Sequence, residues 1–243
     1  RYTLVVCEVA LAVALVTGAG LLLRTLGNLT RVDGGFNRSH LVTFAISLPD
    51  AKYATPVNRR SFYGRLMDQL SATPGVLHAA AMTGLPPLRK VDAATMDIEG
   101  FQPRPNGPSN TIDYRNEITA DYLATMGIPV VEGRAFQSSD TEGAPVVIVN
   151  QTMARALWPE QSPIGHRLRP GPAAPWFTIV GVVRDVKQGG VDKKTGTEVY
   201  FPAGRRALGT MNVVLRTPLA PEALASTIQR TVANLDPSLP IIR

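Results

Sequence analysis

Cysteine is almost absent from this sequence of 243 residues, in which Cys7 stands alone. A single thiol excludes an intramolecular disulfide, a CxxC redox pair and a Cys-rich zinc site. Histidine is scarce as well, because His40, His78 and His166 lie far apart and form neither an HExxH nor an HxH spacing. Zinc sites need several such donors close together, so we expect no metal site.

Catalytic and cofactor motifs are also missing. The sequence contains no GxSxG elbow, no GxxxxGK[ST] phosphate loop, no EF-hand spacing and no GxGxxG after a strand. Two pairs of nearby carboxylates, Asp97 with Glu99 and Asp140 with Glu142, could in principle serve acid/base chemistry. Carboxylates in strands and loops are usually only solvated, so we expect no enzymatic activity and no cofactor.

Basic residues do not gather anywhere in the sequence. The 25 Lys and Arg residues exceed the 19 Asp and Glu residues, which gives a net charge of +6 and a pI near 9.8. A nucleic-acid surface needs its basic side chains clustered on one face. Here they stand singly or in pairs such as Arg59-Arg60 and Arg205-Arg206. Nucleic acid is therefore not an expected partner.

The sequence does contain one long apolar run, residues 4–23, in which Glu8 is the only charge. A helix of this length is about 30 Å long, which matches the hydrocarbon core of a bilayer. Signal peptides have shorter apolar runs, of about 7 to 15 residues, after an initiator Met, whereas this sequence starts at Arg1. We predict a transmembrane helix over 1–24, with a signal peptide or a buried helix as alternatives, in a fragment of a longer protein.

Small side chains recur every four residues within this run, at Ala10, Ala14 and Gly18. This spacing predicts a helix face that a second helix could approach closely. Ala and Gly are also simply common in membrane helices, and both interpretations stay open. Glu8 lies about one turn from the N-terminal end, so we expect it to reach the interface rather than to relay protons.

Residues 25–85 predict the first half of a split βαβ subdomain. A polar neck over 24–39 leads to 41–48, where apolar and polar residues alternate as in a half-buried strand. Thr55 is placed to cap a helix with Pro56 in its first turn, and 76–82 indicate the next strand.

Residues 209–243 repeat this plan and predict the second half. A strand over 211–216 precedes a helix that Pro221 opens, and 241–242 begin a further strand at which the chain is expected to be cut. The two halves can pair into one four-stranded sheet with both helices on one face. The apolar stripes of the two helices are Phe62, Leu66 and Leu70, and Leu224, Ile228, Val232 and Leu235.

Residues 86–208 have a different texture, with short β-like runs between loops rich in Pro and Gly. They predict an inserted, β-rich subdomain. The fold class is therefore α+β, with an N-terminal transmembrane helix and then a split βαβ, ferredoxin-like subdomain that holds this insertion. The expected strands of the insertion are 111–118, 146–149, 178–183 and 198–201, and its short helices are 120–126, capped by Thr119, and 151–157.

Six strings of the sequence, in this order, carry a family resemblance. The run EVALAVALVTGAGLLLRT is followed by VDGGFNRSHLVTFAISLP, FYGRLMDQLSATPGV, ADYLATMGIPVVEGRAF, VIVNQTMARALWPEQSPIGHRL and IVGVVRDV with EVYFPA. Together they resemble the periplasmic core domain of MacB-like ABC-transporter permeases. They are most similar to the second half of the duplicated FtsX-like permeases of acidobacteria. The resemblance covers nearly the whole chain.

The resemblance implies a non-catalytic, extracytoplasmic domain with an anchor helix in the bacterial inner membrane. A cytoplasmic ABC ATPase would drive the permease, whose remaining spans lie outside this sequence. The domain would transmit motion to a periplasmic adaptor or to substrate, in a dimer or pseudo-dimer. The family offers no catalytic motif. The alternatives from other classes are a single-span sensor or ligand-binding module and a membrane-anchored hydrolase.

Overall fold

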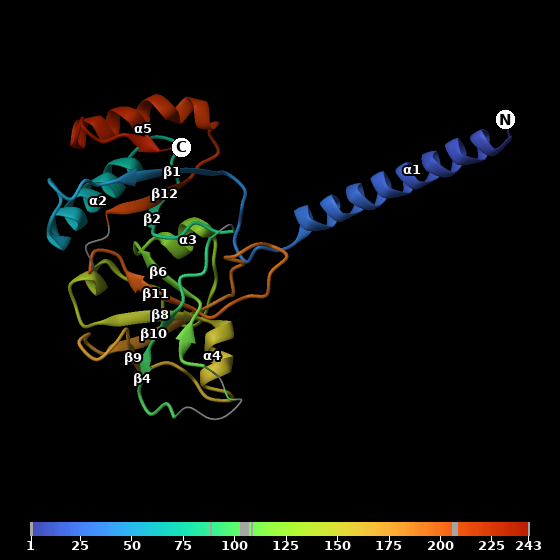
Figure 1. Cartoon of the computed structure of the whole chain (residues 1–243). Coiled ribbons are helices and arrows are strands. Elements are labelled where there is room, and N and C mark those ends of the chain that lie inside the picture. The colour runs from blue at the N-terminus through green and yellow to red at the C-terminus, as the bar shows by residue number, and fades with distance from the viewer. Residues whose placement is uncertain (1, 88, 103–106, 108, 206–208, 243) are drawn as a thin grey trace. The chain divides into compact units, whose positions relative to one another are not determined.

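The computed structural model describes residues 2–87, 89–102, 107, 109–205 and 209–242. Residues up to Gly34 and residues from Gly35 form two separate compact units. The first unit contains helix α1 (Tyr2–Arg31), an uninterrupted helix in Figure 1. Its segment Val5–Thr25 has a mean hydropathy of 2.3 and is unburied, so it is long and apolar enough to cross a membrane.

The first half of the polar neck expected over 24–39 is helical. Helix α1 continues to Arg31 because no proline interrupts residues 24–31. Gly27 alone is insufficient to end the helix, since a single helical glycine is destabilising by only about 1 kcal/mol.

Four antiparallel strands form one end of the second unit, in the order β13-β1-β12-β2 (Figure 1). Helices α2 and α5 lie on one face of these strands, where side chains of both helices share a single core with the strands. This arrangement confirms the α+β fold class. The elements are β1 (Leu41–Ser47), α2 (Pro56–Ser71), β2 (His78–Met82), β12 (Thr210–Arg216), α5 (Pro221–Leu235) and β13 (Ile241–Ile242).

Both helices begin where their sequences indicate. The Thr55 side chain accepts a hydrogen bond from the backbone N–H of Asn58 at 3.2 Å, and Pro56 occupies the first turn of α2. Pro221 likewise opens α5. The stripe residues Phe62, Leu66, Leu70, Leu224, Ile228 and Val232 are all buried in the shared core, and Leu235 packs against it partly buried.

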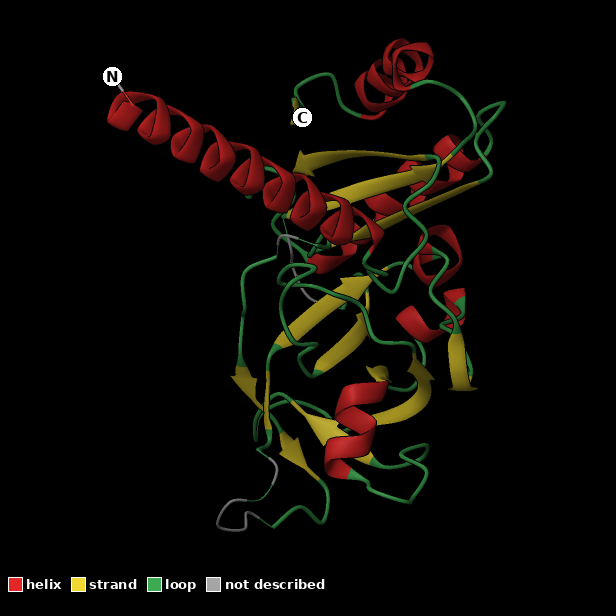
Figure 2. Ribbon diagram, turned by 90° about the vertical axis from the view of Figure 1, so that its right-hand side faces the viewer, coloured by secondary structure: helices red, strands yellow, loops and turns green. Residues whose placement is uncertain are grey.

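The remaining elements continue the same sheet in the order β6-β11-β8-β10-β9-β4 (labelled in Figure 1), with β7 also on β10 and a separate pair β3-β5. Figure 2 shows the strands of the second unit in yellow. Parallel pairs, β6 with β11 and β8 with β10, make this part a mixed sheet. Its elements are β3 (Ala94–Thr95), β4 (Asp97–Ile98), β5 (Thr111–Ile112), β6 (Tyr114–Ile118), α3 (Tyr122–Met126), β7 (Val130–Gly133), the 3-10 turn η1 (Ser138–Thr141), β8 (Val146–Asn150), α4 (Gln151–Leu157), β9 (Arg167–Arg169), β10 (Phe177–Val183) and β11 (Glu198–Pro202).

The expected start of α3 is wrong. The helix begins at Tyr122 rather than at residue 120, and Thr119 does not cap it. The Thr119 hydroxyl instead accepts a hydrogen bond from the backbone N–H of Ala81 on β2 at 3.0 Å. The Thr119 side chain, which the local sequence predicted to cap α3, therefore makes a tertiary contact with β2 instead. Gly127 ends α3 in the left-handed conformation with φ +64°, as expected.

The two parts of the second unit are joined by strand pairing and by a shared core. Met82 on β2 pairs with Ile118 on β6, so the sheet is continuous. Helix α3 covers the face of the four-stranded part opposite α2 and α5, where Tyr122 and Met126 share a core with Val214 of β12. The boundaries expected for the split subdomain, 25–85 and 209–243, and for the insertion, 86–208, stay a prediction.

Candidate functional site

Helix α1 presents its small side chains openly. Ala10 and Ala14 are exposed and Gly18 is half-buried. A Cβ atom placed on Gly18 would meet no atom outside the helix within 4 Å. The face is therefore free to receive a second helix, and its role in helix packing stays a prediction.

Residues 35–40, here called the connector, begin the second unit and lead to β1, and Arg216 holds them against β12 and α3. The Arg216 guanidinium, at the end of β12, donates to the carbonyl oxygens of Asn37 at 3.0 Å and Ser39 at 2.9 Å. It also donates to the carbonyl of Thr125 in α3 at 2.7 Å. The Asn37 backbone N–H completes the clamp by donating to the Met126 carbonyl at 2.9 Å. One arginine thus joins the connector, β12 and α3.

Two glycines allow the connector to lie this close. A Cβ atom on Gly35 would stand 2.0 Å from the Asp185 carbonyl oxygen, so only glycine fits there. A Cβ atom on Gly127 would lie 3.0 Å from the Cβ atom of Asn37. Desolvation lowers the pKa of the Arg216 guanidinium, which carries its charge against the carbonyl oxygens of the connector and α3.

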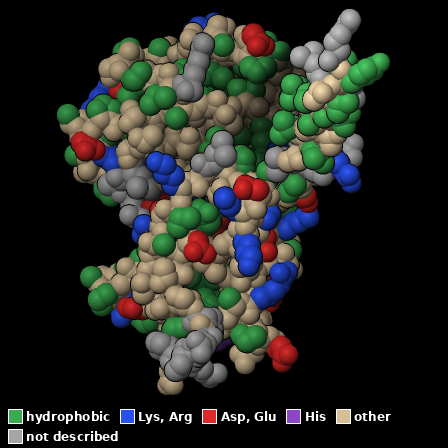
Figure 3. All heavy atoms as spheres, turned by 45° about the vertical axis from the view of Figure 1, so that its right-hand side comes forward, with side chains coloured by type: hydrophobic (Ala, Val, Ile, Leu, Met, Phe, Trp, Pro, Cys, Tyr) green, Lys and Arg blue, Asp and Glu red, His purple; other side chains and the backbone are tan. Residues whose placement is uncertain are grey.

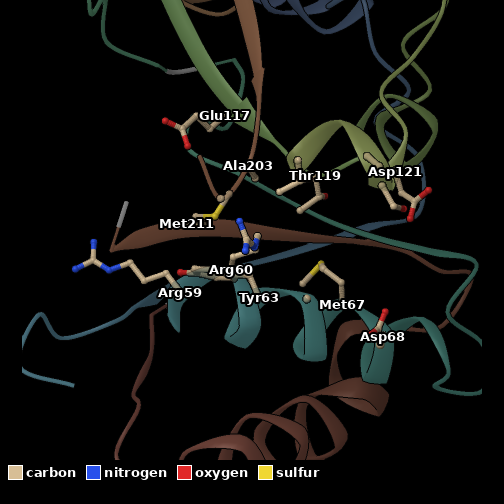
Figure 4. Close-up of a pocket in the computed structure, with 15 residues that line it drawn as sticks. Arg59, Arg60, Tyr63, Met67, Asp68, Glu117, Thr119, Asp121, Ala203 and Met211 are labelled. Atoms are coloured by element: carbon tan, nitrogen blue, oxygen red, sulfur yellow. The ribbon is translucent and has the colours of Figure 1, made fainter. Parts of the chain in front are cut away.

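A cleft of about 200 Å³, here called the α2 cleft, lies between α2 and the loops that follow β6 and β11. Figure 4 shows Arg60, Tyr63 and Met67 rising from α2 on one side, with Glu117 and Thr119 across from them. The cleft therefore separates the four-stranded part from the β-rich part on the face that α2 covers.

Three polar side chains of α2 that line the cleft are engaged in contacts within the fold. The buried Arg59 donates to the Tyr53 carbonyl and pairs with Asp50, both at 2.5 Å. Arg60 pairs with Glu142 at 2.9 Å. Tyr63 donates to the Ile46 carbonyl at 3.0 Å, and burial raises the pKa of its phenol well above the usual range. These contacts hold the wall of the cleft in place.

A fully buried carboxylate, Glu198, lies at the start of β11. Its Oε1 accepts a hydrogen bond from Gln188 at 2.8 Å, and its Oε2 accepts one from the Tyr200 hydroxyl at 2.7 Å. Arg89 lies 3.8 Å from Oε1. Burial raises the pKa of Glu198 to about 7, against the opposing pull of these partners. Arg89 comes from the segment that follows β2, so this network ties that segment to the β-rich part.

The carboxylates considered for acid/base chemistry are all paired with arginines. Asp97 accepts from Arg169 at 2.9 Å, and Glu99 accepts from Arg167 at 2.8 Å. Asp140 forms a two-pronged pair with Arg134, at 2.6 and 2.9 Å, and Glu142 holds Arg60. Each of these carboxylates therefore has an arginine as its ion-pair partner.

No group of three or more His, Cys, Asp or Glu side chains suitable for a metal occurs within the described part of the chain. His40 and His78 are exposed. His166 lies against Trp158 with ring centroids 5.5 Å apart. On the face shown in Figure 3, Lys and Arg side chains are interspersed with Asp and Glu side chains, an arrangement unlike the single-sign stripe of a nucleic-acid surface.

Sequence reasoning missed Arg216 and Glu198. Arg216 ends an apolar strand, so its charge looked like a strand terminus in solvent. Glu198 opens the apolar string EVYFP, and a carboxylate as the first residue of an apolar strand was the one signal that pointed to it. In both cases the partners come from segments far away in sequence.

The sequence match decides the family. Residues 3–231 match the family described as the MacB-like periplasmic core domain. The chain belongs to this family. The resemblance in the sequence strings is thus confirmed, and the chain is a MacB-like periplasmic domain of an ABC-transporter permease with one N-terminal helix able to span a membrane. The closer likeness to acidobacterial duplicated permeases stays a prediction.

Three solved structures share the fold of this MacB-like domain. The periplasmic region of MacB from Actinobacillus actinomycetemcomitans is 13% identical with a TM-score of 0.54, over 86% of this chain and 90% of that chain. The extracellular domain of YknZ, described as a noncanonic ABC-type transporter from Gram-positive bacteria, is 18% identical with a TM-score of 0.51, over 83% and 100%. A domain of a protein described as a permease from Porphyromonas gingivalis is 15% identical with a TM-score of 0.52, over 85% and 91%. Comparison with curated proteins found no match.

Proposed function

We propose that this chain is the anchor helix and periplasmic domain of an inner-membrane export permease, and that it passes motion between a cytoplasmic ATPase and the periplasm without catalysing a reaction itself. The observation that carries the proposal is the family match over 3–231, which includes the apolar helix and most of the compact second unit. Partners would be the ATPase, further permease spans and a periplasmic adaptor or substrate, in a dimer or pseudo-dimer.

The connector supports a mechanical role. Only residues 32–34 separate the end of α1 from the connector. Arg216 then binds the connector to both β12 and α3, so a displacement of the connector acts directly on the sheet and on one helix. A flexible tether would lose such a displacement before it reached the folded unit.

Membrane topology is the first test. In a Cys7→Ser background, Asp192→Cys places a thiol at an exposed loop position of the second unit, and Tyr2→Cys places one at the exposed start of α1. A membrane-impermeant maleimide should label Asp192→Cys in spheroplasts without lysis. It should label the matched Tyr2→Cys variant only after lysis. Labelling of Asp192→Cys only after lysis would contradict the orientation.

Coupling is the second test. In membranes that contain the permease and its ATPase, trapping of nucleotide with vanadate should change the labelling rate of Asp192→Cys. The added change Arg216→Gln should abolish this response but should leave ATP hydrolysis, measured without vanadate, intact. Arg230→Gln, an exposed position on α5, is the matched control and should leave the response intact. A response that survives Arg216→Gln would contradict coupling through the connector.

A further inference from the structure

A second cavity, here called the phenylalanine cavity, adjoins the α2 cleft and has a volume of about 690 Å³. The two hollows share Arg60, Glu117 and Gly204 among their lining residues. Small-molecule sites in proteins commonly measure about 300 to 1,000 Å³. The cavity is therefore large enough for a small organic ligand.

One part of the lining is apolar. Phe177 of β10 and Phe201 of β11 line the cavity with their rings edge to face, at 5.2 Å between centroids. Pro170, Ala174 and Pro175 line it from the segment that precedes β10. Rings and proline faces of this kind accept a flat or aliphatic body without hydrogen bonds.

The charged lining carries one excess positive charge. Among the described lining residues, Arg60, Arg115 and Arg205 stand against Glu117 and Glu142. Arg60 and Glu142 form a 2.9 Å ion pair with each other. Arg115 and Arg205 thus share the one remaining carboxylate of the described lining, Glu117, while Asp92, outside the lining, lies 3.9 Å from Arg115.

Arg115 and Arg205 also hold unused donors. The Nε–H group of each is buried and donates no hydrogen bond to any described residue. Buried guanidinium donors are normally satisfied. The nearest acid to Arg115 Nε is Asp92, at 3.9 Å, which is beyond hydrogen-bond distance. Asp92 also receives two 3.2 Å bonds from Arg89.

Arg205 is held in a fixed position. Its Nη2 donates to the carbonyl oxygens of Asp140 at 2.7 Å and Gly143 at 2.6 Å, beside η1. Desolvation lowers its pKa, and the charge of Asp140 opposes this shift. An anion in the cavity would stabilise the charge of this guanidinium further.

We propose that the phenylalanine cavity binds a small organic monoanion, a carboxylate or sulfonate with an apolar body. The anionic group lies against the guanidinium groups of Arg115 and Arg205, which line the cavity, and the apolar body lies against Phe177 and Phe201. This binding function is separate from the coupling role proposed above. A chain that fails to transmit motion can still bind the anion, and the reverse also holds.

The probe is naphthalene-2-sulfonate, and its neutral counterpart is naphthalene-2-sulfonamide. Both are titrated by calorimetry into the whole chain in phosphatidylcholine nanodiscs, with empty nanodiscs as the blank for partition into lipid. The sulfonate should bind at least about tenfold more tightly than the sulfonamide, because charge-assisted hydrogen bonds are the stronger kind. Arg115→Gln and Arg205→Gln should each weaken sulfonate binding by about fivefold to tenfold.

Two further variants separate the site from general electrostatics. Phe201→Leu should weaken the binding of both probes, since it removes a ring from the cavity. The matched control Arg230→Gln removes an exposed arginine of α5 that does not line the cavity, and it should leave both affinities unchanged. If Arg205→Gln unfolds the chain, Arg115→Gln alone carries the test.

Three results would overturn the proposal. One is equal affinity for the sulfonate and the sulfonamide, which would show that the anion is not recognised. Another is the absence of binding at millimolar sulfonate. The third is an equal loss for Arg230→Gln and Arg115→Gln, which would show attraction to net charge rather than to the cavity.

Discussion

Replacing Glu198 by Gln should remove a pH dependence from the stability of this domain. Glu198 is fully buried, and burial raises its pKa from an ordinary 4.5 to about 7 even though Arg89, Gln188 and Tyr200 favour the charged form. Tyr122, buried nearby, has its own pKa raised by the same desolvation and by the Glu198 charge. The folded state therefore holds a proton that the unfolded state has already released above pH 4.5.

The sign and size follow from linkage. The folded state binds more protons between pH 4.5 and about 7, so the free energy of unfolding falls as pH rises through this window and then stays level. A raised pKa of this extent corresponds to about 3 kcal/mol, at about 1.4 kcal/mol per pH unit. Glu198→Gln is neutral at every pH and cannot contribute this loss. Relative to the natural chain, it should gain up to about 3 kcal/mol between pH 4.5 and 7.5.

Thermal unfolding in one detergent, at half-unit steps from pH 4.5 to 7.5, measures the effect as the difference between variant and natural chain. Glu99→Gln is the matched control. The hydrogen bond from Arg167 lowers the pKa of Glu99, so any stability that Glu99 contributes is lost only below this window and its difference curve should be flat. Parallel curves for Glu198→Gln and the natural chain would refute the assignment of a proton to buried Glu198.

Three other predictions concern packing. Leu66→Ala should lower the free energy of unfolding by about 2 to 5 kcal/mol, because the side chain is fully buried. The control Asp68→Asn, at an exposed position of the same helix, should change it by no more than about 0.5 kcal/mol. Equal melting temperatures for these two variants would show that α2 is not docked. Gly127→Ala should destabilise by about 1 to 2 kcal/mol since φ is +64°, and Gly127→Asn should recover part of this in the same assay. Replacement of residues 86–208 by a short linker should leave a cooperative thermal transition at a lower temperature, since α3 is lost from one face of the sheet. Absence of any transition would contradict the predicted boundaries.

Features set by neighbouring residues were predictable from the sequence. The Thr55 cap, the Pro221 helix start and the Gly127 stop each depend on residues within one turn, and each is present as expected. The buried faces of the helices were also predictable, because apolar residues at helical spacing lie on one face, and that face packs against the core. Helix α4 runs over Gln151–Leu157, as its sequence indicates.

Features decided by distant partners were not predictable. The Thr119 hydroxyl does not cap α3 but accepts a hydrogen bond from Ala81, 38 residues away in the sequence. Strands β3, β4 and β9 have two or three residues each, too few to show alternation. The phenylalanine cavity is lined by residues of β6, β10 and β11 together with Arg205, and no local sequence pattern predicts that these residues lie close together.

The sequence by itself determined an apolar helix of bilayer length, the two helix-and-strand halves and membership of the MacB-like family. These properties depend on composition, on period and on short strings, all of which are read along one stretch of chain. Only the tertiary structure decided that α3 closes the second face of the four-stranded part, that Arg216 ties the connector to β12 and α3, and that Glu198 is buried beside Arg89. A hydrogen bond or a raised pKa depends on which groups burial brings together, and that is a property of the packed fold rather than of any segment within it.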